Sequence, residues 1–168
     1  MRDALSLFDL IVTFSHGKRV TYQTTIDNLH ILDYDYYFRM TDYLFGEQTA
    51  QVLLTFDEIL RKGFDGHNFI VGLAAHFRDL MVCKDAATIG LLEVSDNIKA
   101  RYKEQSAEVP LSFLLSALNI ASQCDISYKG SKNQRLHVEL ALVKIAHLKS
   151  AISLAQVDTQ GDPSKKKS

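Results

Sequence analysis

The sequence contains few of the residues that interrupt or cross-link a polypeptide chain. Among its 168 residues are two prolines, eight glycines and no tryptophan. Because proline and glycine are the residues least compatible with a helix interior, their scarcity leaves room for long helices. The two cysteines, Cys83 and Cys124, are too few for a disulfide framework and fit buried free thiols in a reducing compartment.

The sequence also lacks an excess of positive or negative charge, and it lacks long apolar runs. The formal net charge is -1, with 46% hydrophobic and 23% charged residues, which is typical of a soluble globular protein. A nearly neutral chain has no overall field that attracts nucleic acid or an anionic lipid surface. No apolar run reaches membrane-spanning length, and the N-terminus lacks a signal-peptide layout. These features predict a cytoplasmic location without membrane partners.

The sequence does contain a succession of amphipathic helical patterns, which predicts an all-α helical bundle. Asp33, Asp65 and Ser95 are suitable N-caps, and Ser131-x-x-Gln134 has the spacing of a capping box. The predicted helices cover about residues 2–15, a short stretch to 29, 34–45, a segment ending at 62, 66–84, 86–92, 96–106, 110–124 and a long last helix to about 154.

The composition shifts near Asp33, after the first helical segments, and this predicts a domain boundary there. Residues 1–32 would then form one part and residues 33–155 a second, helical domain. Residues 156–168 are mostly polar and end in the run Lys165–Lys167, so we expect a disordered tail.

The segment 110–124 is apolar on two sides. Leucines share one side and a second apolar group lies roughly opposite, so the helix is expected to be buried between neighbours within a domain. The alternative is a helix half in the core and half in a subunit interface. The candidate interface residues are Leu111, Phe113, Leu114, Leu115, Leu118 and Ile120.

The sequence contains no pattern that would support catalysis or metal binding. A Gly-x4-Gly-Lys-Ser/Thr phosphate loop is absent, so this chain alone is not expected to hydrolyse nucleotides. His76 and Cys83 share a helix face, but packing is a better interpretation than a metal site, and we expect no metal or cofactor.

Two clusters have a possible nucleic-acid interpretation. The aromatic residues of 34–43 could stack on bases, but interleaved aspartates would repel phosphate, which favours packing at a domain junction or interface. Lys129, Lys132 and Arg135 form a small basic patch that could contact DNA or an acidic partner. A solvated face with an Arg135–Glu139 pair is the simpler interpretation.

Several runs together resemble one known family. They are Met1-Arg2-Asp3-Ala4-Leu5-Ser6-Leu7-Phe8-Asp9, Asn28-Leu29-His30-Ile31-Leu32-Asp33-Tyr34-Asp35-Tyr36-Tyr37-Phe38 and Asn133-Gln134-Arg135-Leu136-His137-Val138-Glu139-Leu140-Ala141-Leu142. In this order they resemble the gamma/tau subunit of the bacterial DNA polymerase III clamp loader. The tyrosine-rich second run is similar to the versions found in Bacteroidetes-type bacteria.

The resemblance implies a specific place for the chain in a larger subunit. Members have an AAA+ ATPase domain, a helical lid and a helical third domain that packs into a collar. Residues 1–32 would be the C-terminal part of the lid and residues 33–155 the collar, or oligomerisation, domain. Arg2 matches the sensor arginine that faces the nucleotide in the intact protein. The ATP and magnesium site and the zinc module of the family belong to the first domain, which this chain does not match.

The functional hypothesis that follows is subunit oligomerisation within the complex that loads the sliding clamp during DNA replication. The implied partners are delta, delta prime and further gamma/tau copies, with the sliding clamp and primed DNA reached through the complex. The intact parent would be a subunit of DNA-directed DNA polymerase III with AAA+ ATPase activity. The alternative is a stand-alone helical module that binds nucleic acid or a regulator.

Overall fold

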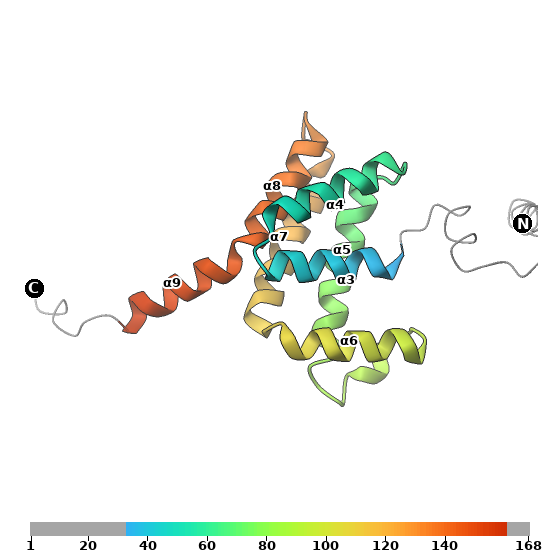
Figure 1. Ribbon diagram of the computed structural model, residues 1–168, viewed down its shortest axis with the longest axis vertical. Coiled ribbons are helices and arrows are strands. Elements are labelled where there is room, and N and C mark those ends of the chain that lie inside the picture. The colour runs from blue at the N-terminus through green and yellow to red at the C-terminus, as the bar shows by residue number, and fades with distance from the viewer. Residues whose placement is uncertain (1–32, 161–168) are drawn as a thin grey trace, which may run out of the picture. The chain divides into compact units, whose positions relative to one another are not determined.

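The computed structural model describes residues 33–160 (Figure 1). The predictions for Arg2, for the helices before residue 32 and for Lys165–Lys167 lie outside the described residues. One compact unit of the chain begins at Asp35 and contains nearly all of the described part. The division of the chain into lid and collar domains stays a prediction.

The described part is built entirely from helices, and it contains no strand, which confirms the all-α prediction. Its elements are α3 (Tyr34–Phe45), α4 (Thr49–Arg61), α5 (Gly66–Val82), the 3-10 helix η1 (Ile89–Leu91), α6 (Asp96–Glu108), α7 (Leu111–Tyr128), α8 (Gln134–Ala146) and α9 (Leu148–Gln160).

Helices α5 and α7 pack against each other and form the centre of the bundle (Figure 1). Helix α8 packs against both of them and against α4, while α6 lies against α5 and α9 begins beside α7 and α8. The side chains with no measurable exposure include Met40, Leu44, Val52, Phe56, Ile59, Ile70, Leu73, Phe77, Leu80, Leu114, Val138, Leu142 and Ile145. Burial of such apolar side chains is the main stabilising contribution to the domain.

Local sequence explains where most of these helices begin. The Asp65 side chain accepts a hydrogen bond from the Asn68 backbone N–H at 3.3 Å, as predicted for an N-cap of α5. Ser95 occupies the N-cap position of α6 without a capping side-chain bond. Pro110 lies at the N-cap of α7 rather than at its first helical position.

The predicted long last helix is wrong in two respects. Asn133, not Ser131, provides the cap, because its side chain accepts a hydrogen bond from the Leu136 N–H at 3.0 Å. The Ser131 hydroxyl instead donates to the Asn133 carbonyl oxygen at 3.2 Å. The helix is also interrupted at His147, which forms the C-cap of α8, so the segment forms two helices.

The predicted tail begins too early. Helix α9 continues through Gln160, so residues 156–160 are helical rather than disordered. The sequence has no glycine or proline between Gly130 and Gly161, so nothing in the local chemistry ends the helix sooner.

The predicted short helix after Asp85 is also wrong. The Asp85 side chain accepts a hydrogen bond from the Ala87 N–H at 2.8 Å, an Asx turn that competes with helix formation. Only the three-residue helix η1 follows.

No single helix of the described part is long and apolar enough to cross a membrane. The helices α6 and α7 reach the required length and composition only as a pair, and this pair is bent by 109°.

Candidate subunit interface

Helix α7 separates its apolar residues between the domain core and the surface. Phe113 is 1% exposed and Leu114 is 0% exposed, so the expectation that these two residues face another subunit is wrong. The Phe113 ring meets the Phe45 ring edge-to-face, with centroids 5.2 Å apart. The physical reason is the packing of α7 against α5 and α8, which covers this side of the helix.

Three other candidates remain more accessible on α7. Leu111 is 47% exposed and Leu115 is 50% exposed, while Leu118 is half-buried. Their spacing of four and three residues places all three on one helix face. We call these residues the α7 leucine stripe. An apolar row of this kind on a helix is a suitable contact surface for another helix.

A groove lies between α7 and α8 and includes the last candidate, Ile120. Its volume is about 310 Å³. The lining residues are Asn119, Ile120, Gln123, Cys124 and Ser127 from α7 and His137, Leu140, Ala141 and Lys144 from α8. Leu140 at its rim is 51% exposed. We call this feature the α7–α8 groove.

The two cysteines are buried in apolar surroundings. Burial raises the pKa of the Cys124 thiol, which lines the floor of the α7–α8 groove, and it also raises the pKa of Cys83. Neither cysteine forms a disulfide, in agreement with the prediction of free thiols. A thiol with a raised pKa is mostly protonated at neutral pH and a poor nucleophile.

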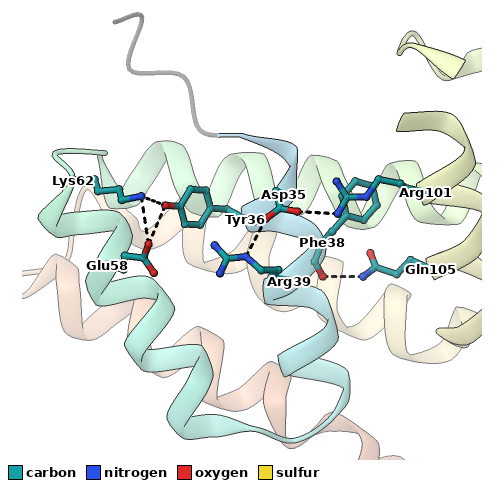
Figure 2. A network of polar contacts seen from close by, with 8 residues as sticks. All are labelled: Asp35, Tyr36, Phe38, Arg39, Glu58, Lys62, Arg101 and Gln105. Carbon is teal, nitrogen blue, oxygen red and sulfur yellow. Dashed lines mark hydrogen bonds and ion pairs between the residues drawn. The ribbon is translucent and has the colours of Figure 1, made fainter. Parts of the chain in front are cut away.

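A network of polar contacts holds α3 between two neighbouring helices (Figure 2). On one side the Tyr36 hydroxyl donates to Glu58 of α4 at 3.1 Å and accepts a hydrogen bond from the Lys62 amine. On the other side Arg101 of α6 forms an ion pair with Asp35, with an N–O distance of 3.0 Å. These exposed contacts connect the first turn of α3 to α4 and α6, and the Arg39 guanidinium and the Lys62 amine lie over the Tyr36 ring, 4.9 Å and 5.1 Å from its centroid.

Two further aromatic residues of α3, Tyr37 and Phe38, pack against α5, which favours the packing interpretation over base stacking for these two. Phe38 is 4% exposed, and its ring meets the His76 ring edge-to-face at a centroid distance of 4.8 Å. The Tyr37 ring stacks on the Phe69 ring at 6.0 Å. Both residues therefore help to attach α3 to α5.

His76 is a buried structural residue. Its Nδ1 lies 3.0 Å from the Tyr102 hydroxyl and its Nε2 lies 2.9 Å from Gln105 Oε1. Because the Gln105 amide nitrogen donates to the Phe38 carbonyl oxygen, its oxygen faces the ring, so His76 carries its proton on Nε2. Burial lowers the pKa of His76 to about 4, which keeps the ring neutral.

The packing interpretation of His76 is therefore confirmed. The described residues contain no group of three histidine, cysteine or acidic side chains placed to hold a metal ion.

The basic patch is partly occupied by carboxylates. Arg135 contacts Glu139 at 3.0 Å, which confirms the predicted pair, and it also contacts Asp57 of α4 at 2.9 Å. A guanidinium that is shared between two carboxylates presents little positive field to a phosphate. Lys129 and Lys132 are exposed.

The sequence reasoning missed one feature that bears on binding. Helix α9 exposes Leu154 by 67% and Val157 by 66%. Apolar residues recur up to Val157 without a glycine or proline, and this pattern could have predicted that the helix continues. The prediction of a tail from residue 156 did not take it into account.

Comparison with known proteins agrees with the resemblance. Residues 20–157 match the family model of DNA polymerase III subunits gamma and tau domain III. The chain is 28% identical over 162 residues to DNA polymerase III subunit tau of Bacillus subtilis (strain 168). This alignment covers 94% of the chain but only 28% of the tau subunit, so the chain spans little more than a quarter of that relative. These matches favour the clamp-loader interpretation over a stand-alone helical module that binds nucleic acid or a regulator. The chain belongs to the family of DNA polymerase III subunits gamma and tau, domain III.

Proposed function

We propose that this domain joins the subunits of a bacterial clamp loader to one another through the α7 leucine stripe. The observation that carries this proposal is the exposure of Leu111 and Leu115, at 47% and 50%, beside the fully buried Leu114. The bundle is complete without these leucines, so their apolar surface is available for a partner.

Simple energetics support a role in assembly. Complete burial of an exposed leucine contributes about 1.5–3 kcal/mol, so covering the exposed halves of Leu111 and Leu115 contributes about 2 kcal/mol together. This free energy is only part of what stable association requires, so further contacts must surround the two leucines in the interface. The apolar contribution is independent of nucleotide, which suits a constant structural connection.

The proposal extends to the intact parent subunit. ATP and magnesium would bind in the ATPase domain, and the described residues contribute no nucleotide site to the proposal. Arg2 would sense the nucleotide in the intact protein, whereas the isolated chain would not hydrolyse ATP. The partners would be delta, delta prime and further gamma/tau copies in the bacterial cytoplasm, and the clamp and primed DNA would be contacted through the complex.

The test compares two exposed leucines. Leu115→Asp places a charge in the α7 leucine stripe, and Leu91→Asp places the same charge in η1, where Leu91 is 59% exposed. Both variants should keep the wild-type melting temperature, because neither side chain belongs to the core. In reconstitution with the other clamp-loader subunits, Leu115→Asp should lower assembly at least tenfold and Leu91→Asp should not. Equal assembly of both variants would contradict the proposal.

A further inference from the structure

Helix α9 projects from the bundle, and its first turn contacts the end of α3 and the loop that follows it (Figure 1). The Ser150 backbone N–H and hydroxyl both donate to the Glu47 carboxylate, the backbone contact measuring 2.9 Å. The Lys149 amine lies over the Phe45 ring, 4.7 Å from its centroid. Beyond this first turn the helix extends away from α7 and α8. We call residues 151–160 the α9 arm.

The composition of the α9 arm is unsuited to a helix that stays in water. A helix of 13 residues is marginally stable without tertiary packing. Leu154 and Val157 are 67% and 66% exposed, and Asp158 is the only charged residue of the arm. A solvent-exposed helix normally has a charged face, so this arm has the character of a helix that is covered on binding.

The α7–α8 groove is complementary to the α9 arm in apolar surface and in charge. The α7–α8 groove has a volume of about 310 Å³ and an apolar rim at Leu140. Its ionisable side chains, apart from the Cys124 thiol, are His137 and Lys144, so any charge they add is positive. The single acidic residue of the arm, Asp158, is complementary to Lys144.

We propose that the α9 arm of one copy of this chain docks in the α7–α8 groove of a second copy. This inference rests on the proposed function and specifies a contact between identical subunits, separate from the α7 leucine stripe. Figure 1 shows the α9 arm leading away from α8, so it does not lie in the groove of its own chain, and Glu47 and Phe45 contact its first turn in this orientation.

The arrangement determines the symmetry of the contact. Arm and groove are different surfaces, so each copy gives its arm to one neighbour and accepts the arm of another. Contacts of this head-to-tail kind form rings or open chains instead of closed twofold dimers. The α7 leucine stripe remains free for a different subunit.

The decisive experiment mixes two defective variants of the full chain. Leu154→Asp combined with Val157→Asp disables the arm, whereas Leu140→Asp disables the groove, and Leu91→Asp is the matched control. At about 100 µM, where a contact with a dissociation constant of about 10 µM is mostly occupied, wild type and the control should sediment as oligomers. Each defective variant alone should be monomeric, and an equimolar mixture should give 1:1 heterodimers.

A charge exchange provides an independent test. Asp158→Lys and Lys144→Asp should each weaken self-association at least threefold at low salt, and the double variant should recover it. Circular dichroism and melting temperature check that all variants remain folded.

The possible failures are distinguishable. Oligomers that are insensitive to the arm and groove variants but lost in Leu115→Asp would overturn the arm contact and leave the proposed function in place. A wild-type chain that remains monomeric at about 100 µM would also overturn the arm contact. Assembly with other clamp-loader subunits through Leu115 would then still be measurable. Heterodimers that fail to form in the mixture would exclude the arm–groove pairing.

Discussion

The Tyr37 ring of α3 lies directly against Gly72 of α5. A methyl group placed on Gly72 would be 2.1 Å from the Tyr37 hydroxyl oxygen and 2.6 Å from the ring carbon that bears it. Burial at this contact raises the pKa of Tyr37 to about 12. The absence of a side chain on Gly72 is therefore what allows α3 to approach α5 so closely.

Gly72→Ala should destabilise the domain by about 2 kcal/mol, in the range of overpacked cores. Alanine alone would favour a helix by about 1 kcal/mol over glycine, so the sign of the measured change shows that the clash dominates. Gly90→Ala is the control, because an added methyl there meets nothing within 4 Å. The measurement is urea unfolding. In a Tyr37→Ala background, Gly72→Ala should become neutral or stabilising, and persistent destabilisation would refute the contact.

The neutral state of His76 predicts a loss of stability in mild acid. The pKa of His76 is about 4 in the folded domain and 6.5 in the unfolded chain. Above pH 6.5 both states are neutral and the residue contributes no pH dependence. As the pH falls from 6.5 to 4, only the unfolded state gains a proton, which costs about 3 kcal/mol of stability at the lower limit.

Two measurements separate His76 from the other titrating groups. Between pH 7 and pH 5 the ring protons of His76 in an NMR titration should move by only about one tenth of the full protonation shift, because pH 5 lies one unit above the pKa. His76→Gln should flatten the acid side of the stability profile, although it lowers stability at pH 7 by disturbing Tyr102 and Gln105. A ring that titrates near pH 6.5 in the folded domain would contradict the buried neutral assignment.

Helix caps supply a prediction with an internal control. Asp65→Ala and Asn133→Ala should each lower the free energy of unfolding by about 1 kcal/mol, because each removes a side-chain acceptor from a helix N-terminus. Ser95→Ala should change it by much less, because the Ser95 side chain makes no capping bond. Thermal denaturation of the three variants is sufficient, and equal losses would show that the cap geometry is wrong.

In the full-length parent subunit, Arg2→Ala should separate assembly from nucleotide response. A guanidinium that faces a phosphate contributes only when the phosphate is present, whereas apolar burial holds subunits together in every nucleotide state. The variant should therefore form complexes normally but show reduced ATP-dependent clamp loading in a fluorescence assay. Loss of assembly with normal loading by the residual complexes would contradict this division of roles.

Helices with clear boundary chemistry could be predicted closely from the sequence. The bounds of α3 were predicted to the residue between Asp33 and Gly46, and the Asp65 cap of α5 was identified correctly. The break at His147 could not be predicted, because no residue near it disfavours a helix. It accompanies the contacts of Lys149 and Ser150 with the end of α3 and the loop that follows it, about a hundred residues earlier in the chain.

The candidate interface was harder to predict for a related reason. Leu114 and Leu115 are adjacent and chemically identical, yet one is buried and the other is half exposed. On a helix with apolar residues on two sides, only the position of the neighbouring helices decides which side is covered. That position depends on contacts such as Tyr37 with Gly72, which local periodicity does not encode.

The amide group of Gln105 has a consequence for the alignment of α6. Its nitrogen donates to the Phe38 carbonyl oxygen at 2.9 Å and to Asp42 at 2.8 Å, while its oxygen faces His76. Sliding α6 by one residue would leave the buried Phe38 carbonyl oxygen and the buried His76 ring without this partner, which costs far more than a shifted apolar contact. Gln105 therefore contributes more to specificity than to stability, because its hydrogen bonds are satisfied in only one register of α6 against α3 and α5.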